Sequence, residues 1–135
     1  MNRSLIMKVE AVLGAVFGLA LLFAPNALLA VYRAEPMTGV GIYNSMLYGG
    51  CLIALALMNW TASGVGASEA RHVVLGTLVA NSLGFLVAIT RQLTDQSVPA
   101  AAWFNVVLFL VFAVLYGYLQ FAHAPSGNPA AGSTA

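Results

Sequence analysis

The sequence has very little charge. Asp, Glu, Lys and Arg make up only 7% of its 135 residues, whereas 61% are apolar. A water-soluble domain carries about 25% charged residues, and the few present here could not cover the surface of one. The basic residues are scattered singly and the net charge is +1, so no basic stripe exists to hold a nucleic-acid backbone. We therefore expect a membrane protein with no nucleic-acid partner.

The sequence also lacks the patterns that carry most enzyme chemistry. Its single cysteine, Cys51, excludes an intramolecular disulfide, and the spacing of Cys and His suits neither zinc nor an iron–sulfur cluster. There is no Gly-rich phosphate loop, nucleophile elbow or pair of carboxylates. His72 and His123 are predicted to lie at the same membrane face, but no supporting pattern around them indicates a haem or metal site. We expect no cofactor, no metal and no enzymatic activity.

What the sequence has in abundance is long apolar runs. Four of them reach about 20 residues, the length that an α-helix needs to cross about 30 Å of hydrocarbon. Transmembrane strands would instead alternate polar and apolar residues over about 10 positions. We therefore predict an all-α fold, an integral membrane four-transmembrane-helix bundle with short loops. The predicted spans are residues 5–24, 40–60, 72–90 and 100–121.

Two shorter segments follow the first and last spans. Pro25 ends the first span, and residues 26–32 are apolar but too short to cross, so we predict a short interfacial helix with Pro25 in its first turn. Residues 124–135 are small, polar and aperiodic, and we predict them to be disordered. Residues 1–123 then form a single transmembrane domain. Glu10 beside the first apolar run argues against a cleaved signal peptide.

The basic residues predict the orientation, because Lys and Arg favour cytoplasmic loops. Arg3, Lys8 and Arg71 fall on one side of the predicted bundle, and Arg33 and Arg91 fall on the other. With four spans, both termini share a side. We expect a multi-pass protein of the bacterial cytoplasmic membrane with both termini in the cytoplasm.

Small residues recur at four-residue spacing in three of the predicted spans. Lipid provides no hydrophobic drive for helices to associate, so close backbone packing at small residues supplies much of the attraction. These stripes could pack helices within one chain or between chains. They comprise Gly14 and Gly18; Gly41, Ser45 and Gly49; and Gly76, Ala80, Gly84 and Ala88.

Polar residues inside the spans are predicted to gather near one membrane face. Glu10 shares a helix face with Gly14 and Gly18, so it is expected to face other helices. At about 1.5 Å of rise per residue, Glu10, Thr77 and Tyr116 all lie roughly 7 to 8 Å inside the same face. Asn44, Asn59, Asn81 and Asn105 are expected to make interhelical hydrogen bonds. The predicted polar cluster comprises Glu10, Arg71, His72, Thr77, Asn81 and Tyr116.

Glu10 permits two interpretations. An ionisable residue inside a span is by default a functional-site hypothesis, here a carboxylate that binds a proton or a cation. In the alternative, Glu10 reaches to water or pairs with Lys8, Arg71 or His72 and fixes the helix register. Its shallow depth favours the alternative.

Some short motifs resemble a known group of membrane proteins. They are Ala24-Pro25 closing the first span, the Tyr48-Gly49-Gly50 turn and Arg71 opening the third span. In these the chain resembles the DoxX-like group of small bacterial four-helix integral membrane proteins, over residues 5–121. Some members of that group resemble subunits of quinone-linked oxidoreductases, so the resemblance implies a helper role. It transfers no cofactor-binding residue to this chain.

Two functions from different classes remain open. We expect a non-catalytic interaction or accessory subunit, or a lipid-contacting scaffold, because the chain has small-residue stripes and almost no mass outside the predicted membrane. Its partners would be membrane lipids and either another protein or a second copy of itself. The alternative is a small transporter or binder of an apolar or cationic ligand, with Glu10, Thr77, Asn81 and Tyr116 lining an intramembrane cavity.

Overall fold

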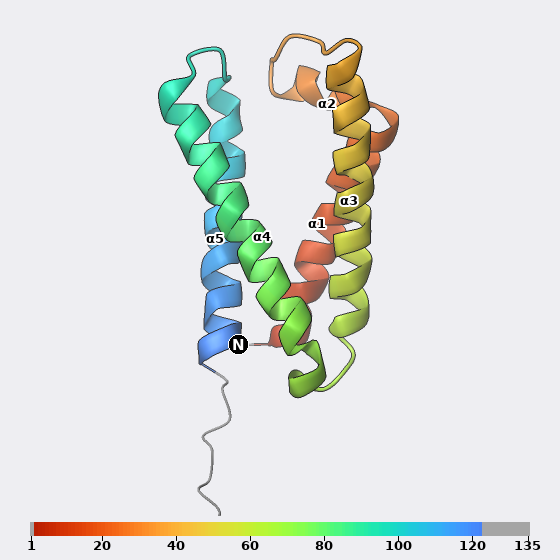
Figure 1. Ribbon diagram of the computed structural model, residues 1–135, viewed down its shortest axis with the longest axis vertical. Helices are drawn as coiled ribbons and strands as arrows, with labels where there is room; N and C mark the ends of the chain where they lie inside the picture. Colours follow the sequence, from red (N-terminus) through yellow and green to blue (C-terminus); the bar gives the residue numbers. More distant parts are fainter. Residues whose placement is uncertain (1, 123–135) are drawn as a thin grey trace, which may run out of the picture.

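The computed structural model describes residues 2–122, and this part of the chain is helical with no strand. The segment predicted to be disordered, residues 124–135, and His123 lie outside the described residues. Figure 1 shows the course of the chain. The elements are α1 (Arg3–Phe23), α2 (Pro25–Val31), α3 (Val40–Ala62), α4 (Ala67–Thr94), the short 3-10 helix η1 (Ala100–Ala102) and α5 (Trp103–Phe121).

Four helical segments are long and apolar enough to cross a membrane: α1, α3, α4, and η1 together with α5. The prediction of an all-α fold with four such helices is confirmed. The largest difference in bounds is in α4, which is longer at both ends than the predicted span 72–90. Its first turn is stabilised by Glu69, whose Oε2 accepts a hydrogen bond from the backbone N–H of Gly66 at 3.3 Å.

The chain turns sharply between α1 and α3. Pro25 occupies the first turn of α2, where its missing N–H leaves no bond unmade. The loop after α2 is held by Asn26, whose Oδ1 accepts from the N–H of Met37 at 2.8 Å and whose Nδ2 donates to the Met37 carbonyl at 3.1 Å. These bonds hold α2 close to the start of α3.

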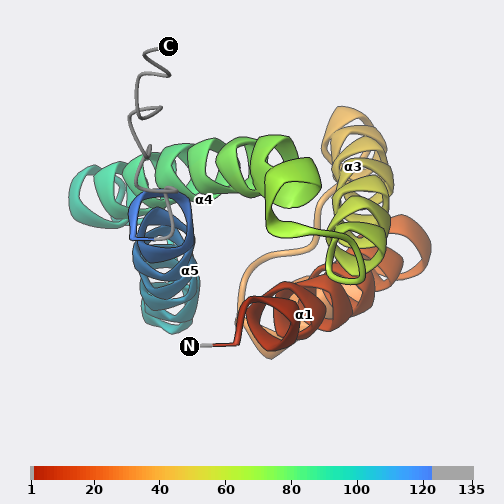
Figure 2. The same cartoon turned by 90° about the horizontal axis from the view of Figure 1, so that it is seen from below.

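The long helices form two antiparallel pairs, α1 with α3 and α4 with α5 (Figures 1 and 2). The pairs meet at the end of the molecule that holds the α3–α4 turn, and they diverge toward the end that holds α2 (Figure 1). At the end that holds the α3–α4 turn, Arg3 of α1 donates to the carbonyls of Val65 and Gly66 and so links α1 to this turn. The bundle is therefore closed at one end and splayed at the other.

The apolar core lies at the closed end, where both pairs contribute to it. Met7 and Ala70 are fully buried there, and Val74, Phe112 and Leu119 pack with them. Towards the splayed end each pair buries side chains mainly within itself.

Within the first pair, α1 and α3 approach most closely at two glycines of the predicted small-residue stripes. A Cβ atom on Gly49 would lie 2.6 Å from the Gly18 carbonyl oxygen and 2.8 Å from the backbone nitrogen of Leu22. A Cβ atom on Gly18 would lie 2.9 Å from the Gly49 carbonyl oxygen. Since backbone atoms cannot swing aside, only glycine fits at this crossing. The next residue, Gly50, has no heavy atom within 4 Å of such a Cβ.

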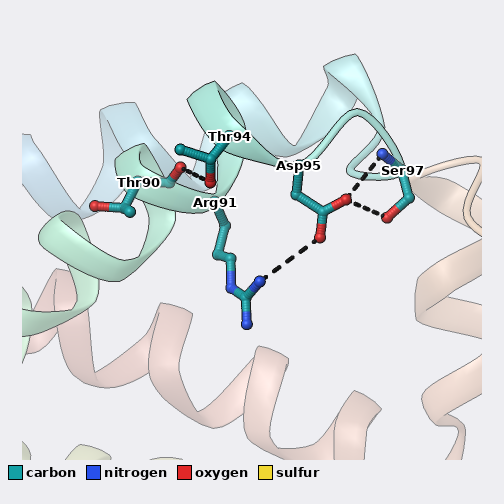
Figure 3. Close-up of polar contacts among 5 residues, drawn as sticks. All are labelled: Thr90, Arg91, Thr94, Asp95 and Ser97. Atoms are coloured by element: carbon teal, nitrogen blue, oxygen red, sulfur yellow. Dashed lines mark hydrogen bonds and ion pairs between the residues drawn. The ribbon is translucent and has the colours of Figure 1, made fainter.

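A set of short-range polar contacts ends α4 (Figure 3). Asp95 Oδ1 accepts from the hydroxyl of Ser97 at 2.6 Å and from its N–H at 3.0 Å, and Oδ2 lies 3.8 Å from Arg91 Nη1. The Thr94 hydroxyl donates to the Thr90 carbonyl at 2.7 Å. The hydroxyl of Ser97, its N–H and the Arg91 charge hold the pKa of Asp95 below its ordinary value, because each favours the ionised carboxylate.

The glycine crossing gives a first prediction. Gly49→Ala places a methyl group against backbone atoms, and we expect it to destabilise the protein by about 1–3 kcal/mol. Gly50→Ala is the matched control, since its methyl group enters open space and alanine favours a helix. Thermal unfolding in detergent, followed by circular dichroism, should show a lower Tm for Gly49→Ala alone. Equal Tm values for the two variants would contradict the close crossing.

A second prediction concerns the end of α4. Ser97→Ala removes the hydroxyl donor that contributes most to the low pKa of Asp95, so this pKa should rise toward its ordinary value. Thr94→Ala is the control, because the Thr94 hydroxyl is bonded to Thr90 and not to Asp95. A pH titration of the Asp95 carboxyl carbon by NMR measures both. No change in Ser97→Ala would show that the bond does not form in solution.

Candidate functional site

Polar side chains from all four long helices meet at the closed end of the bundle. Asn59 Oδ1, on α3, accepts from the Thr77 hydroxyl of α4 at 3.2 Å and from the Tyr116 hydroxyl of α5 at 3.0 Å. Asn81, also on α4, donates from Nδ2 to Glu10 Oε1 of α1 at 2.6 Å and to the Thr77 carbonyl at 3.0 Å. We call these five residues the polar network.

Helix periodicity explains why these residues meet. Thr77 and Asn81 are four positions apart, so they lie on the same face of α4, one turn from each other. That face is turned toward the other pair, and both side chains are buried there. Asn59 and Tyr116 are fully buried as well, with an exposed fraction of 0%. Buried polar groups are expensive unless they are hydrogen-bonded, so these bonds help to fix how the two pairs join.

Two polar atoms of the network lack a hydrogen-bond partner among residues 2–122. They are Oε2 of Glu10 and Nδ2 of Asn59, and both atoms are buried. The Tyr116 hydroxyl lies beside the Glu10 carboxyl group, but its proton is already donated to Asn59. The carboxyl group of Glu10 therefore has one firm donor, Asn81, and spare capacity to bind something else.

The structure brings together four of the six residues of the predicted cluster: Glu10, Thr77, Asn81 and Tyr116. Arg71 and His72 do not join them, because both lie in the first turns of α4 with exposed side chains. They precede Thr77 by six and five residues, which corresponds to about 9 and 8 Å along the helix axis.

Glu10 has no ion-pair partner in the described part of the chain, where the pair Arg91–Asp95 stands alone. Lys8 lies over the ring of Trp60, 5.8 Å from its centroid, and Arg3 is bonded to loop carbonyls. The sequence-based alternative in which Glu10 pairs with Lys8, Arg71 or His72 is therefore not seen. A charge that balances Glu10 has to come as a proton or a bound cation.

Asn59 was expected to bond between helices but was not among the residues of the predicted cluster. A signal for it exists: Asn59 lies three residues before the end of α3, which puts it close to the level of Glu10 near the start of α1. Asn105 of α5 accepts a bond from Tyr32, which follows α2, whereas Asn44 is exposed and its side chain makes no hydrogen bond to another helix within residues 2–122.

An apolar cavity of about 840 Å³ extends from the polar network between the two helix pairs. Glu10, Asn59 and Asn81 line it at the closed end of the bundle, and Leu28 of α2 and Pro99 line it toward the splayed end. Its volume falls within the range of pockets that enclose small molecules, roughly 300–1,000 Å³. Between the two ends the wall is hydrocarbon and aromatic, with Leu13, Phe17, Leu21, Leu52, Leu108 and Phe109 among its residues.

Two contacts bridge the pairs where they diverge. The rings of Phe17 on α1 and Phe104 on α5 stack with centroids 6.4 Å apart. The Tyr32 hydroxyl, just after α2, donates to Asn105 Oδ1 of α5 at 3.0 Å. Partial burial raises the pKa of Tyr32. The short helix predicted to lie at the interface thus also forms part of the cavity wall.

The cavity and the network together combine an apolar wall with a few polar groups, as small-molecule sites do. No group of three or more His, Cys, Asp or Glu residues that could hold a metal ion occurs in residues 2–122. The cavity wall contains one formal charge, that of Glu10, and no basic side chain. This arrangement can bind a largely apolar molecule and place one polar group of it at the network.

The network gives a third prediction. Asn81→Ala removes the donor to Glu10 Oε1 and leaves the carboxyl group without a firm partner, so we expect a loss of about 1–3 kcal/mol in unfolding free energy. Arg71→Ala, on the exposed side of the same helix, is the control and should change stability little. Unfolding in mixed micelles of increasing denaturing detergent measures both. Similar losses in the two variants would argue against a stabilising network.

Comparisons with protein-family models, with curated proteins and with solved structures find no match to this chain.

Proposed function

We propose that this is an integral membrane protein that binds a small apolar or amphipathic molecule in the cavity between its two helix pairs. The observation that carries the proposal is the cavity itself, about 840 Å³ of space with walls contributed by all four long helices. Glu10, Asn59 and Asn81 at one end of it supply the few polar contacts that orient a ligand.

The membrane location is supported by the outer surface of the helices. Large apolar side chains are exposed along every long helix, among them Val16, Leu57, Leu93 and Val114, each at least 59% exposed. A soluble monomer rarely exposes apolar surface on this scale, whereas lipid tails would cover it without cost. We further propose that both termini lie in the cytoplasm of a bacterial cell, from the distribution of Lys and Arg.

The membrane also explains why the cavity persists. In water, a wedge lined by leucine and phenylalanine would collapse, because burying apolar surface is favourable. In lipid this drive is absent, since lipid tails are as apolar as leucine side chains. Each pair can then be stable by itself, α1 with α3 at Gly18 and Gly49, and α4 with α5 where the Phe109 ring covers Gly84. The space between the pairs stays open to an apolar guest.

The accessory-subunit role expected from the sequence is a second candidate. It is favoured by one observation on α4: Gly76 is exposed, and a methyl group added there would have no heavy atom within 4 Å. This part of the stripe is free to pack against another helix. The binding role has the stronger support, because Gly18, Gly49 and Gly84 are all used within the chain.

The test of the binding role uses Cys51, the sole cysteine of the chain, because this residue lines the cavity. We expect a photoreactive long-chain alcohol, added to the protein in lipid nanodiscs, to crosslink to cavity-lining residues. Cys51→Trp fills part of the cavity and should reduce this crosslinking severalfold. Gly50→Trp changes the neighbouring residue, which does not line the cavity, and should leave it intact. Crosslinks confined to the outer helix faces, or equal effects of the two variants, would contradict the proposal.

A further inference from the structure

We infer that the ligand of this cavity is an elongated amphiphile whose cationic, hydrogen-bond-donating head group binds at Glu10, with its tail directed toward α2. This inference rests on the proposed binding function and adds the chemical class and the orientation of the ligand. Among the described residues that line the cavity, Glu10 at the network is the sole charged side chain, and the polar pair toward α2, Tyr32 and Asn105, is already joined by a hydrogen bond. This is the pattern of a molecule with a single charged head.

The charge of the head group follows from what surrounds Glu10. Its Oε1 accepts one bond from Asn81, and its Oε2 has no partner within the described chain. The basic residues nearest in sequence are engaged elsewhere, Lys8 over Trp60 and Arg3 at the α3–α4 loop. No basic side chain lines the cavity. An ammonium group satisfies both the missing charge and the missing donor, whereas a sulfate or carboxylate head would be repelled.

The size of the ligand follows from the dimensions of the cavity. Its wall on α1 runs from Glu10 to Leu21, which corresponds to about 16 Å at 1.5 Å of rise per residue. An extended chain advances about 1.2 Å per bond, so a tail of about 13 bonds spans this length. The volume of about 840 Å³ corresponds to about 30 non-hydrogen atoms at roughly 30 Å³ each. The tail can therefore be broader than one straight alkyl chain, for example branched or ring-bearing.

The head group should dominate selectivity. A tail that moves from lipid into the cavity exchanges one hydrocarbon environment for another and gains little. A charge-assisted hydrogen bond to Glu10 is available only in the cavity, and such bonds change binding by about tenfold or more. Ligands that share the same tail should therefore differ in binding strength according to their head groups.

The test uses photoreactive twelve-carbon probes that differ only in their head group: a primary ammonium, a hydroxyl and a sulfate. They are added to the protein in nanodiscs of zwitterionic lipid, so that the lipid itself does not select by charge. For the wild type we expect crosslinking to cavity-lining residues to be about tenfold stronger for the ammonium probe than for the alcohol, and weakest for the sulfate. This ranking requires no variant, so it decides the inference even if a Glu10 variant folds poorly.

Glu10→Gln should abolish the preference for the ammonium probe over the alcohol, because the glutamine amide carries no charge. Glu35→Gln makes the same chemical change at an exposed residue outside the cavity and should preserve the wild-type ranking. If the ammonium probe and the alcohol label the cavity equally in the wild type, the head-group inference is wrong and the binding function stands. If no probe labels cavity-lining residues, the binding function is wrong as well.

Discussion

The hydrogen bonds among Glu10, Asn59, Thr77, Asn81 and Tyr116 are the interaction on which the rest of this structure depends. They connect all four long helices at one end of the bundle, where apolar surroundings make an unpaired polar group expensive. Arg3 strengthens the same end through its bonds to the α3–α4 loop. At the opposite end the pairs are bridged only lightly, by a ring contact and the bond between Tyr32 and Asn105 in the described chain. The cavity is a consequence of this unequal closure.

A bilayer changes which forces decide binding in such a cavity. Hydrophobic transfer contributes most of the affinity of apolar ligands that arrive from water, but it nearly vanishes for a tail that arrives from lipid. Electrostatics gains weight instead, because a charge in a low-dielectric medium interacts more strongly than in water. In the proposed binding role, a single carboxyl group with an unpartnered oxygen, Glu10 Oε2, can then select a ligand although most of the remaining wall is apolar. The network that joins the helices would thereby also supply the recognition group of the proposed binding role.

Much of the helical architecture was predictable, and so was part of the polar network. Hydropathy gave the four long helices, and Pro25 marked the break before α2. Depth along the helices indicated that Glu10, Thr77 and Tyr116 share a level, because the rise per residue is nearly constant. Asn59 was missing from the predicted cluster, because depth along a helix does not say which way a side chain faces. Arg71 and His72 were included in that cluster, but they precede Thr77 by six and five residues along α4 and their side chains are exposed.

The sequence by itself determined the number, the approximate extent and the apolar character of the helices. This is so because a helix satisfies its backbone hydrogen bonds locally and a membrane requires a run of about 20 apolar residues. Only the tertiary structure decided which helices pair, how each is rotated and that the pairs diverge. Those properties depend on contacts between residues far apart in the chain, such as Gly18 with Gly49 and Asn81 with Glu10. Small-residue stripes and single polar residues occur on several faces, so hydropathy cannot select among the pairings; close packing and hydrogen-bond geometry can.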